Sequence, residues 1–207
     1  MNSVKLFFHY CPYGFSNCYI VGTEDSPKND AVIIDPGVMD RQLLDYIENN
    51  DFTLRGILIT HDHQGHVHGL RSLMRIYNFE TYAVNRTILE YDVNPVKDGD
   101  SITIGSITAE VISIPGHSSD SAVYRIGNML FTGDVLTAGL VGSTASTYGA
   151  TLQVNNLRSR ILSLPGEYTV LPGHGPPSSL EAERRFNAGI ARYDNNRSRR
   201  PTFRLEL

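Results

Sequence analysis

Cysteine and tryptophan are scarce in this sequence, which has two cysteines and no tryptophan in 207 residues. Cys11 and Cys18 lie seven residues apart, outside any C-x-x-C pattern, which argues against a disulfide framework and favours a reducing compartment, the cytoplasm. Cys18 lies in the apolar run 17–21, so it is predicted to be a small core residue.

Long apolar runs are also missing. No stretch of about 18 apolar residues is present, so no membrane-spanning helix is predicted. Residues 1–9 contain too short an apolar region, and no small-residue cleavage pattern, for a secretory signal peptide.

Positive charge is not in excess, because the formal net charge is −4. We therefore expect no nucleic-acid partner. Several arginines do gather between residues 192 and 204, where they could attract an anion, but a solvated terminal face is the favoured interpretation.

The apolar pattern predicts an alternating α/β chain that forms a single domain over residues 1–207. The predicted strands are 17–21, 31–34, 54–59, 82–84, 102–104, 107–112, 121–126, 129–131 and 168–171. Helices are predicted after the N-cap residue Asp40, at 70–77, at 87–90, at 157–164, and around Leu180 to Phe186 near the end of the chain. Residues 139–150 are predicted to be a flexible loop.

Histidine is concentrated where one predicted strand ends. His61, His63, His66 and His68 lie within one short segment that directly follows the apolar run 56–59. Side chains alternate in an extended segment, so His61 and His63 are expected to point to the same side. His66 can reach a neighbouring point if the chain begins to turn into a helix there. Imidazole suits zinc or iron, so this segment predicts a metal site.

Three more candidate ligands follow other predicted strands. His117 follows the strand 107–112, Asp134 follows 129–131, and His174 follows 168–171. An α/β scaffold brings residues just beyond its strands to one edge of a sheet. Separate loops are therefore expected to build one metal centre from these residues.

Six short motifs in this order resemble the metallo-β-lactamase superfamily, and most of all its small glyoxalase II-like hydrolases. They are Asn-Cys-Tyr at 17–19, Ile-Asp-Pro-Gly at 34–37, Thr-His-Asp-His-Gln-Gly-His at 60–66, Pro-Gly-His-Ser at 115–118, Phe-Thr-Gly-Asp at 131–134 and Leu-Pro-Gly-His-Gly-Pro at 171–176. The resemblance covers nearly the whole chain. It implies an αββα sandwich, with two mixed sheets flanked by helices and two metal ions in a shallow cleft at one edge.

The resemblance also implies a role for each ligand. By it, His61, His63 and His117 hold a first metal ion, His66 and His174 hold a second, and Asp134 bridges the two. Asp35 is implied to orient a metal-binding histidine from behind.

The implied chemistry needs no side-chain nucleophile. A metal-bound hydroxide, formed because metal binding lowers the pKa of water from 15.7 toward about 7, would attack an ester or thioester carbonyl of a small-molecule substrate. Zn²⁺, as one or two ions, is the expected cofactor.

Gly65 departs from the family pattern, which usually has an aspartate just before the histidine that corresponds to His66. The second ion could be held by the remaining ligands and water, or His68 could substitute for the aspartate. Alternatively, one Fe²⁺ could be bound as in the persulfide dioxygenases of this superfamily, whose ligands correspond to His61, His117 and Asp134. A metal-binding protein with weak or no catalysis is the third interpretation, and the hydrolase is favoured.

The stretch after the third ligand motif departs as well. Glyoxalase II-like relatives commonly carry an arginine and an aspartate where residues 142–147 read Gly-Ser-Thr-Ala-Ser-Thr, which weakens the prediction of a glutathione thioester as the substrate. Tyr148 in this stretch is a candidate substrate contact, with an ordinary loop position as the alternative. β-Lactam hydrolysis and RNA processing are not expected.

Overall fold

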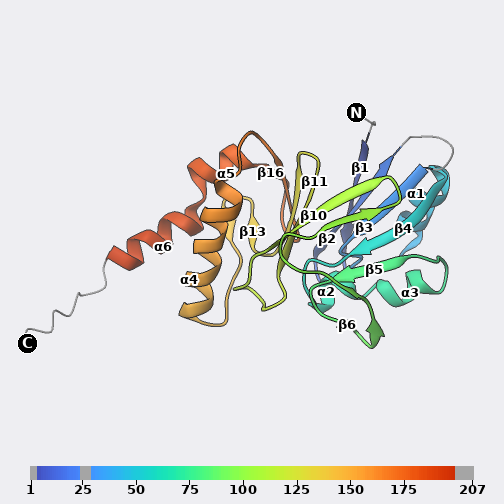
Figure 1. Ribbon diagram of the computed structural model, residues 1–207, viewed down its shortest axis with the longest axis horizontal. Coiled ribbons are helices and arrows are strands. Elements are labelled where there is room, and N and C mark those ends of the chain that lie inside the picture. The colour runs from blue at the N-terminus through green and yellow to red at the C-terminus, as the bar shows by residue number, and fades with distance from the viewer. Residues whose placement is uncertain (1–3, 24–28, 199–207) are drawn as a thin grey trace, which may run out of the picture.

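The computed structural model describes residues 4–23 and 29–198, with side chains of the last helix described as far as residue 193. Two six-stranded sheets face each other, and helices cover their outer faces (Figure 1). The predicted α/β sandwich is therefore confirmed. Within the described ranges, no helix is long and apolar enough to cross a membrane.

The first sheet combines an antiparallel and a parallel half. Its order is β1 (Val4–Cys11), β2 (Ser16–Thr23), β3 (Asn29–Ile34), β4 (Phe52–Leu58), β5 (Glu80–Ala83) and β8 (Asn94–Pro95). The pairs β1–β2 and β2–β3 are antiparallel, whereas the pairs β3–β4, β4–β5 and β5–β8 are parallel. The parallel half directs the carboxyl ends of β3 and β4 to the same edge.

The second sheet is mostly antiparallel. Its order is β16 (Ser178–Ser179), β15 (Thr169–Pro172), β12 (Met129–Gly133), β11 (Ala122–Ile126), β10 (Ile107–Ser113) and β9 (Ser101–Ile104). Only β12 and β15 pair in parallel, which brings the segments after both strands to one edge. Two small ribbons complete the strands: β6 (Thr87–Ile88) with β7 (Tyr91–Asp92), and β13 (Leu136–Thr137) with β14 (Leu140–Val141).

Helices lie on both outer faces. α1 (Arg41–Asn49), α2 (Gln64–Val67) and α3 (Leu70–Met74) lie beside the first sheet; α4 (Thr147–Asn156), a π-helical segment (Leu157–Leu162) and α5 (Leu180–Phe186) lie beside the second. α6 (Ala188–Ser198) follows α5 and projects from this side (Figure 1). Asp40 is the N-cap of α1, as predicted, since its carboxylate accepts a hydrogen bond from Leu43 N at 2.9 Å.

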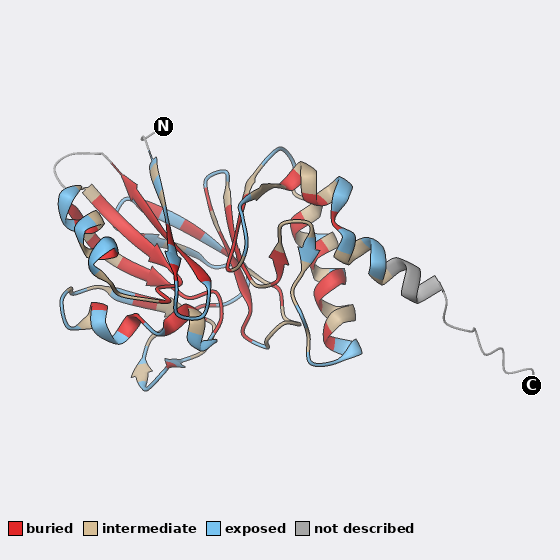
Figure 2. Cartoon of the chain, turned by 180° about the vertical axis from the view of Figure 1, so that it is seen from behind, coloured by how far each residue is buried: buried red, intermediate tan, exposed pale blue. Residues whose placement is uncertain are grey.

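Three apolar layers correspond to the layers of the sandwich. The layer between the sheets includes Tyr19, Val32, Tyr124 and Phe131. Outer layers pack α1, α2 and α3 on the first sheet, and the π-helical segment and α5 on the second. Figure 2 shows the buried strands in the middle of the molecule and the exposed outer faces of the helices. Cys18 is fully buried in the first outer layer, which confirms its predicted core position.

Several elements differ from the prediction. Residues 87–90 form β6 and the turn into β7 instead of a helix, with Leu89 at φ +55°, a left-handed conformation that a helix cannot contain. Within the predicted loop 139–150, α4 begins, because the Ser146 side chain caps it by accepting a hydrogen bond from Gly149 N at 3.0 Å. The edge strand β1 was not predicted.

Candidate metal centre

Six of the predicted ligands converge at one edge of the sandwich. Their ligand atoms form two groups, and within each group all of them lie within 4.8 Å of one another. The first group consists of His61, His63, His117 and Asp134, and the second of His66, Asp134 and His174. Asp134 belongs to both.

The separations in the first group suit the ligands of one ion. His63 Nδ1 lies 3.0 Å from His61 Nε2 and 3.1 Å from His117 Nε2. Asp134 Oδ2 lies 3.7 Å from His61 Nε2 and 3.6 Å from His117 Nε2. Ligands at about 2.0–2.1 Å from a tetrahedral Zn²⁺ are about 3.3–3.4 Å apart, so this donor set fits such an ion.

The second group has similar spacing and a further sign of a cation site. Asp134 Oδ1 lies 3.5 Å from His66 Nε2, and Asp134 Oδ2 lies 3.4 Å from His174 Nε2. Among the described residues, His66 Nε2 and Asp134 Oδ1 are buried atoms without a hydrogen-bond partner. Burying such atoms unpaired is costly. Two facing ligand atoms would be satisfied by a divalent cation between them.

Backbone carbonyls fix two of the imidazoles. His117 Nδ1 donates a hydrogen bond to Ser143 O at 2.8 Å, and His174 Nδ1 donates to Phe15 O at 2.9 Å. A carbonyl oxygen only accepts, so each Nδ1 carries the proton. Each Nε2 therefore presents its lone pair toward Asp134, as a metal ligand requires.

Asp35 supports His66 from behind. Its Oδ2 accepts hydrogen bonds from His66 Nδ1 at 3.0 Å and from Thr60 Oγ1 at 2.6 Å, and its Oδ1 accepts one from Thr60 N at 2.8 Å. Asp35 is buried after β3, with a left-handed φ of +52°. The carboxylate thus joins the end of β3 to the histidine segment, which is the place that the sequence resemblance implied for it.

Burial and neighbouring charges give the candidate ligands different pKa values in the metal-free protein. Burial lowers the pKa of His61 to about 3, so this imidazole is neutral at pH 7. Burial opposes charge on His66 too, but the carboxylates of Asp35 and Asp134 raise its pKa to about 10. Burial also opposes ionisation of Asp134, yet His66, His61 and His174 lower its pKa to about 2. A cation bound by the second group would therefore displace a proton from His66.

The β1–β2 turn lies beside Gly65 and leaves room for a Cβ there. Ser16 Oγ donates a hydrogen bond to Gly65 O at 2.5 Å. A Cβ at position 65 would lie 3.6 Å from Gly14 Cα and 3.9 Å from Ser16 Cβ, which are ordinary contacts. Gly14 is more constrained, because it has φ +79° and its own Cβ would lie 2.7 Å from Gly65 Cα.

His68 lies outside both ligand groups. Its exposed ring stacks on Tyr13, with ring centroids 4.0 Å apart and an interplanar angle of 25°. Residue 68 ends the short helix α2, and two residues correspond to about 200° of rotation, so its side chain points away from that of His66. The structure therefore does not support the predicted substitution of His68 for an aspartate.

Other residues near the centre were missed or placed differently by sequence reasoning. Tyr148 lies in the first turn of α4 and is 76% exposed, so it is on a helix and not in a loop. Asp120 joins the histidine segment to the segment after β5, since its Oδ2 accepts hydrogen bonds from Asp62 N at 2.9 Å and from Asn85 Nδ2 at 3.0 Å. Its position two residues after the His117 motif was the available signal.

Comparisons with known proteins agree with this geometry. A family model described as the metallo-beta-lactamase superfamily matches residues 11–174. An uncharacterized protein of Mycobacterium tuberculosis (strain ATCC 25618 / H37Rv) is 29% identical over 205 residues, which cover 83% of this chain and 91% of that protein. A hydroxyacylglutathione hydrolase of Hahella chejuensis is 31% identical over 166 residues, which cover 77% of this chain but only 62% of the hydrolase.

The fold comparison agrees with the sequence comparison. The crystal structure of ETHE1 from Myxococcus xanthus matches with a TM-score of 0.80 and 26% sequence identity, over 96% of this chain and 92% of that one. The family resemblance inferred from the six motifs is confirmed, since the matched region includes all of the ligand positions up to His174. The chain belongs to the metallo-beta-lactamase superfamily.

Proposed function

We propose that this protein is a metal-dependent hydrolase that cleaves the ester or thioester bond of a small molecule at a centre of two divalent ions. The observation that carries this proposal is Asp134, whose carboxylate belongs to both ligand groups and presents an oxygen to each. A shared carboxylate is the arrangement expected when two ions lie close together and act on one bond.

Zinc is the first choice of metal. The first group offers three imidazoles and one carboxylate, and the second offers two imidazoles and the shared carboxylate, which are borderline ligands that suit Zn²⁺ and also Fe²⁺. Such ions would lower the pKa of a bound water toward about 7 and polarise a substrate carbonyl.

The chain's own residues orient this chemistry. Asp35, Ser143 and Phe15 hold the imidazoles of His66, His117 and His174 in fixed directions. His61 and His66 are buried, whereas His63 is exposed and the side chain of His174 is 39% exposed. We therefore propose that substrate reaches the centre from the side where His63 and His174 lie.

Exposed aromatic residues on the segments that orient His174 and His117 suit an apolar portion of the substrate. Phe15, whose carbonyl orients His174, is 70% exposed, and Tyr13 is 43% exposed in the same turn. Tyr148 follows the segment that supports His117 and is 76% exposed. We assign the rings of Phe15 and Tyr148 to substrate contact, whereas Tyr13 stacks on His68. No charged side chain specific for glutathione is assigned.

The iron-dependent alternative uses part of the same site. His61, His117 and Asp134 are two imidazoles and a carboxylate within the first group, a ligand set that suits one Fe²⁺ with open positions. Gly65 leaves the second group with three side-chain ligands, which keeps a single-ion enzyme, or a weakly active metal-binding protein, as the competing outcome.

Metal content and substrate turnover, measured on the same preparation, test the proposal. About two zinc ions per chain, with hydrolysis of an S-hydroxyacylglutathione or a simple p-nitrophenyl ester that stops on chelation and returns with Zn²⁺, is the expected result. One iron ion per chain, with oxygen uptake that depends on a persulfide, would contradict the proposed hydrolase and favour a dioxygenase. Stoichiometric metal without turnover would leave a binding protein.

The cytoplasm is the proposed location. Cys11 and Cys18 are both free thiols, although both are fully buried in the same apolar layer on adjacent strands. Neighbouring thiols that remain unbridged suit a reducing compartment.

A further inference from the structure

β1 forms a long sheet edge. It is the terminal strand of the first sheet, and among the described strands it pairs with β2 alone. All eight of its residues are in register with β2, without a bulge, and none is proline or glycine. Every second residue of such a strand directs its backbone N–H and C=O away from β2, and these groups are a template for another strand.

The other edges of the two six-stranded sheets are short. β8 and β16 have two residues each, and β8 includes Pro95, which lacks a backbone donor. β9 has four residues. Short strands, proline and lysine are usual means by which a protein blocks edge-to-edge pairing, and of these β1 has only Lys5, near its start. β1 is therefore the edge best suited to accept a further strand.

Four apolar side chains form a row along this edge. They lie on the face of β1 that continues the layer between the sheets, because Phe8 is in register with Tyr19 of that layer and the two ring centroids are 5.7 Å apart. Tyr19 is buried, whereas the members of the row are 38–51% exposed: Val4, Leu6, Phe8 and Tyr10. A neighbouring strand would cover this row while it pairs with the backbone edge.

We propose that β1 pairs antiparallel with β1 of a second copy of this chain, about a two-fold axis at Phe7. Facing residues are then equally distant from Phe7, so residues 4–10 of the two copies face one another. A shift by one residue would place the two apolar rows on opposite faces, because side chains alternate along a strand. A shift by two would leave part of each row uncovered. The register centred on Phe7 therefore joins the two rows over their whole length.

The two copies are complementary in this register. Leu6 of one copy faces Phe8 of the other, and the two-fold symmetry makes this aliphatic–aromatic contact twice. Lys5 faces His9 of the second copy, whose Nε2 lies 3.1 Å from Asp40 Oδ2. The lysine of the edge is thereby brought near a carboxylate. These contacts favour a second copy over an unrelated strand as the occupant of the edge.

The proposed interface ends beside the β1–β2 turn. Tyr10 lies one position before the end of β1, and the turn carries Phe15, whose carbonyl orients His174. Pairing of the two copies would restrict the hairpin and hold this support in place. The interface does not depend on the hydrolase activity, since no candidate metal ligand lies in β1.

Sedimentation velocity of the zinc-loaded full chain tests the proposal. A single strand pair makes a small interface, so we expect a dimer with a Kd of about 1–100 μM. The measured mass should rise from that of one chain toward that of two as the protein concentration increases from about 1 to about 300 μM. One chain at every concentration would overturn the proposal.

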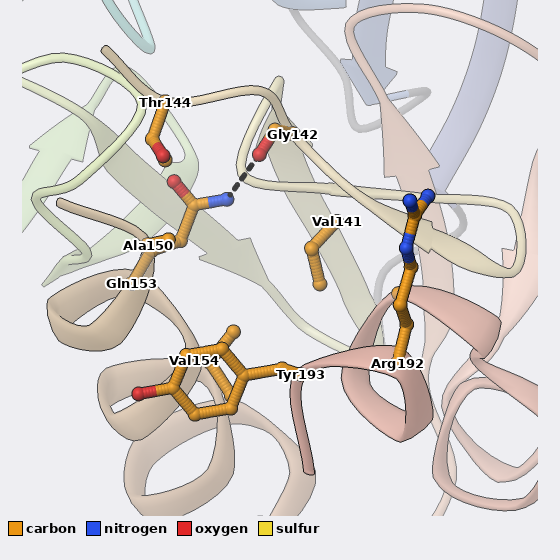
Figure 3. Close-up of a pocket in the computed structure, with 9 residues that line it drawn as sticks. Val141, Gly142, Thr144, Ala150, Gln153, Val154, Arg192 and Tyr193 are labelled. Carbon is orange, nitrogen blue, oxygen red and sulfur yellow. Dashed lines mark hydrogen bonds between the residues drawn. The ribbon is translucent and has the colours of Figure 1, made fainter. Parts of the chain in front are cut away.

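Charged substitutions in the row test whether β1 forms the interface. Leu6→Lys and Phe8→Glu each place an unpaired charge against an apolar side chain of the other copy, twice by symmetry, so each is expected to raise the Kd by about tenfold or more. Leu140→Lys and Leu140→Glu are the matched controls. Leu140 is 55% exposed on β14, beside Val141, which lines a cavity between α4 and α6 (Figure 3). A dimer that is unchanged in both row variants would place the contact elsewhere and contradict the proposal.

A mixture of the two row variants tests the register. Each variant alone is expected to be monomeric at a concentration where the unchanged protein dimerises, whereas an equal mixture should form a dimer. In the mixed dimer the new ammonium faces the new carboxylate, and the other Leu6–Phe8 pair is intact. If either variant fails to fold, as judged by circular dichroism, Val4→Lys with Tyr10→Glu repeats the test at the other facing pair. A mixture that stays monomeric while both variants are folded would overturn the proposed pairing.

Discussion

The two ligand groups of the metal centre share Asp134 but differ in number and in support. The first group has four ligands, and its members His61, His63 and His117 follow β4 and β10. The second has three, since Gly65 offers no side chain. The first group is therefore complete for a tetrahedral ion, whereas the second needs a ligand from outside the chain.

The supports of the two groups also differ. His117 is held by Ser143 O, which follows Asp134 closely in the chain, whereas His174 is held by Phe15 O, 159 positions away. His66 depends on Asp35, a buried carboxylate in a left-handed conformation. The second group thus depends on contacts between distant segments, and we expect it to be the weaker and more easily lost site.

Removal of the shared carboxylate has the largest expected effect. Asp134→Ala takes a ligand from both groups, so we expect loss of the second ion, weaker binding of the first, and a fall in hydrolysis of at least about 10³-fold, equivalent to about 4 kcal/mol of barrier. Metal analysis and the ester assay measure these losses. Asp45→Asn, an exposed change on α1, is the control for charge. Two retained ions in Asp134→Ala would contradict the shared-ligand assignment.

Single histidine variants test the two ligand groups separately. His174→Ala leaves the second group with two side-chain ligands, so the metal content is expected to fall from about two ions to about one. His63→Ala leaves three in the first group and is expected to weaken that ion without removing it. Metal content after dialysis distinguishes them. His68→Ala is the matched control; loss of an ion from it would restore His68 as a ligand.

Gly65→Asp should make the two groups more alike by giving the second group a fourth ligand. A carboxylate at this position supplies the fourth ligand of the second group, and its Cβ meets only ordinary contacts at 3.6–3.9 Å. We expect affinity for the second ion to rise by about tenfold, or about 1.4 kcal/mol, in a chelator competition. Gly65→Ala adds the Cβ without the carboxylate, and an equal gain in it would contradict this explanation.

Acidification is expected to release the second ion before the first. In the metal-free protein the pKa of His66 is raised to about 10, so metal must displace a proton there, and affinity should fall about tenfold per pH unit below that value. Burial lowers the pKa of His61 to about 3, so the first group loses no such affinity near neutral pH through His61. Chelator titrations at about pH 6 and about pH 8 measure the difference. Parallel losses from both groups would contradict it.

The raised pKa of His66 has the opposite effect on the stability of the metal-free protein, which is greater at low pH. A pKa raised from 6.5 to about 10 stabilises the folded chain fully below pH 6.5, and this stabilisation is lost as the pH rises through about 10. Asp35→Asn should reduce this pH dependence, since that carboxylate is one of the two that raise the pKa of His66. Urea unfolding of the metal-free protein across this range measures the change.

Residue type made the convergence of the candidate ligands predictable, because imidazole and carboxylate side chains stand out directly after apolar strands. The same reasoning placed Asp40 and Cys18 correctly. It could not identify Phe15 or Ser143, because these residues act through backbone carbonyls that every amino acid has. The supports of the site are therefore less visible in the sequence than its ligands.

Two further features depended on tertiary contacts. α4 was hidden by its β-branched and glycine residues near Tyr148, which are poor helix formers, and it is stabilised by the Ser146 cap and by buried Gln153 and Val154. Gln153 carried no catalytic signature. Its importance arises from the carbonyls of Val135 and Gly142, which lie beside Asp134 and Ser143.

The contact between Phe15 and His174 has a consequence for the order of folding. Asn17 joins the same two regions, since its N donates to Gly173 O at 2.7 Å and its Nδ2 donates to Pro172 O at 2.9 Å. These contacts close a loop of more than 150 residues, so they require most of the chain to be in place. We expect the second group to assemble last during folding. An ion bound there would hold the β1–β2 hairpin against the end of β15.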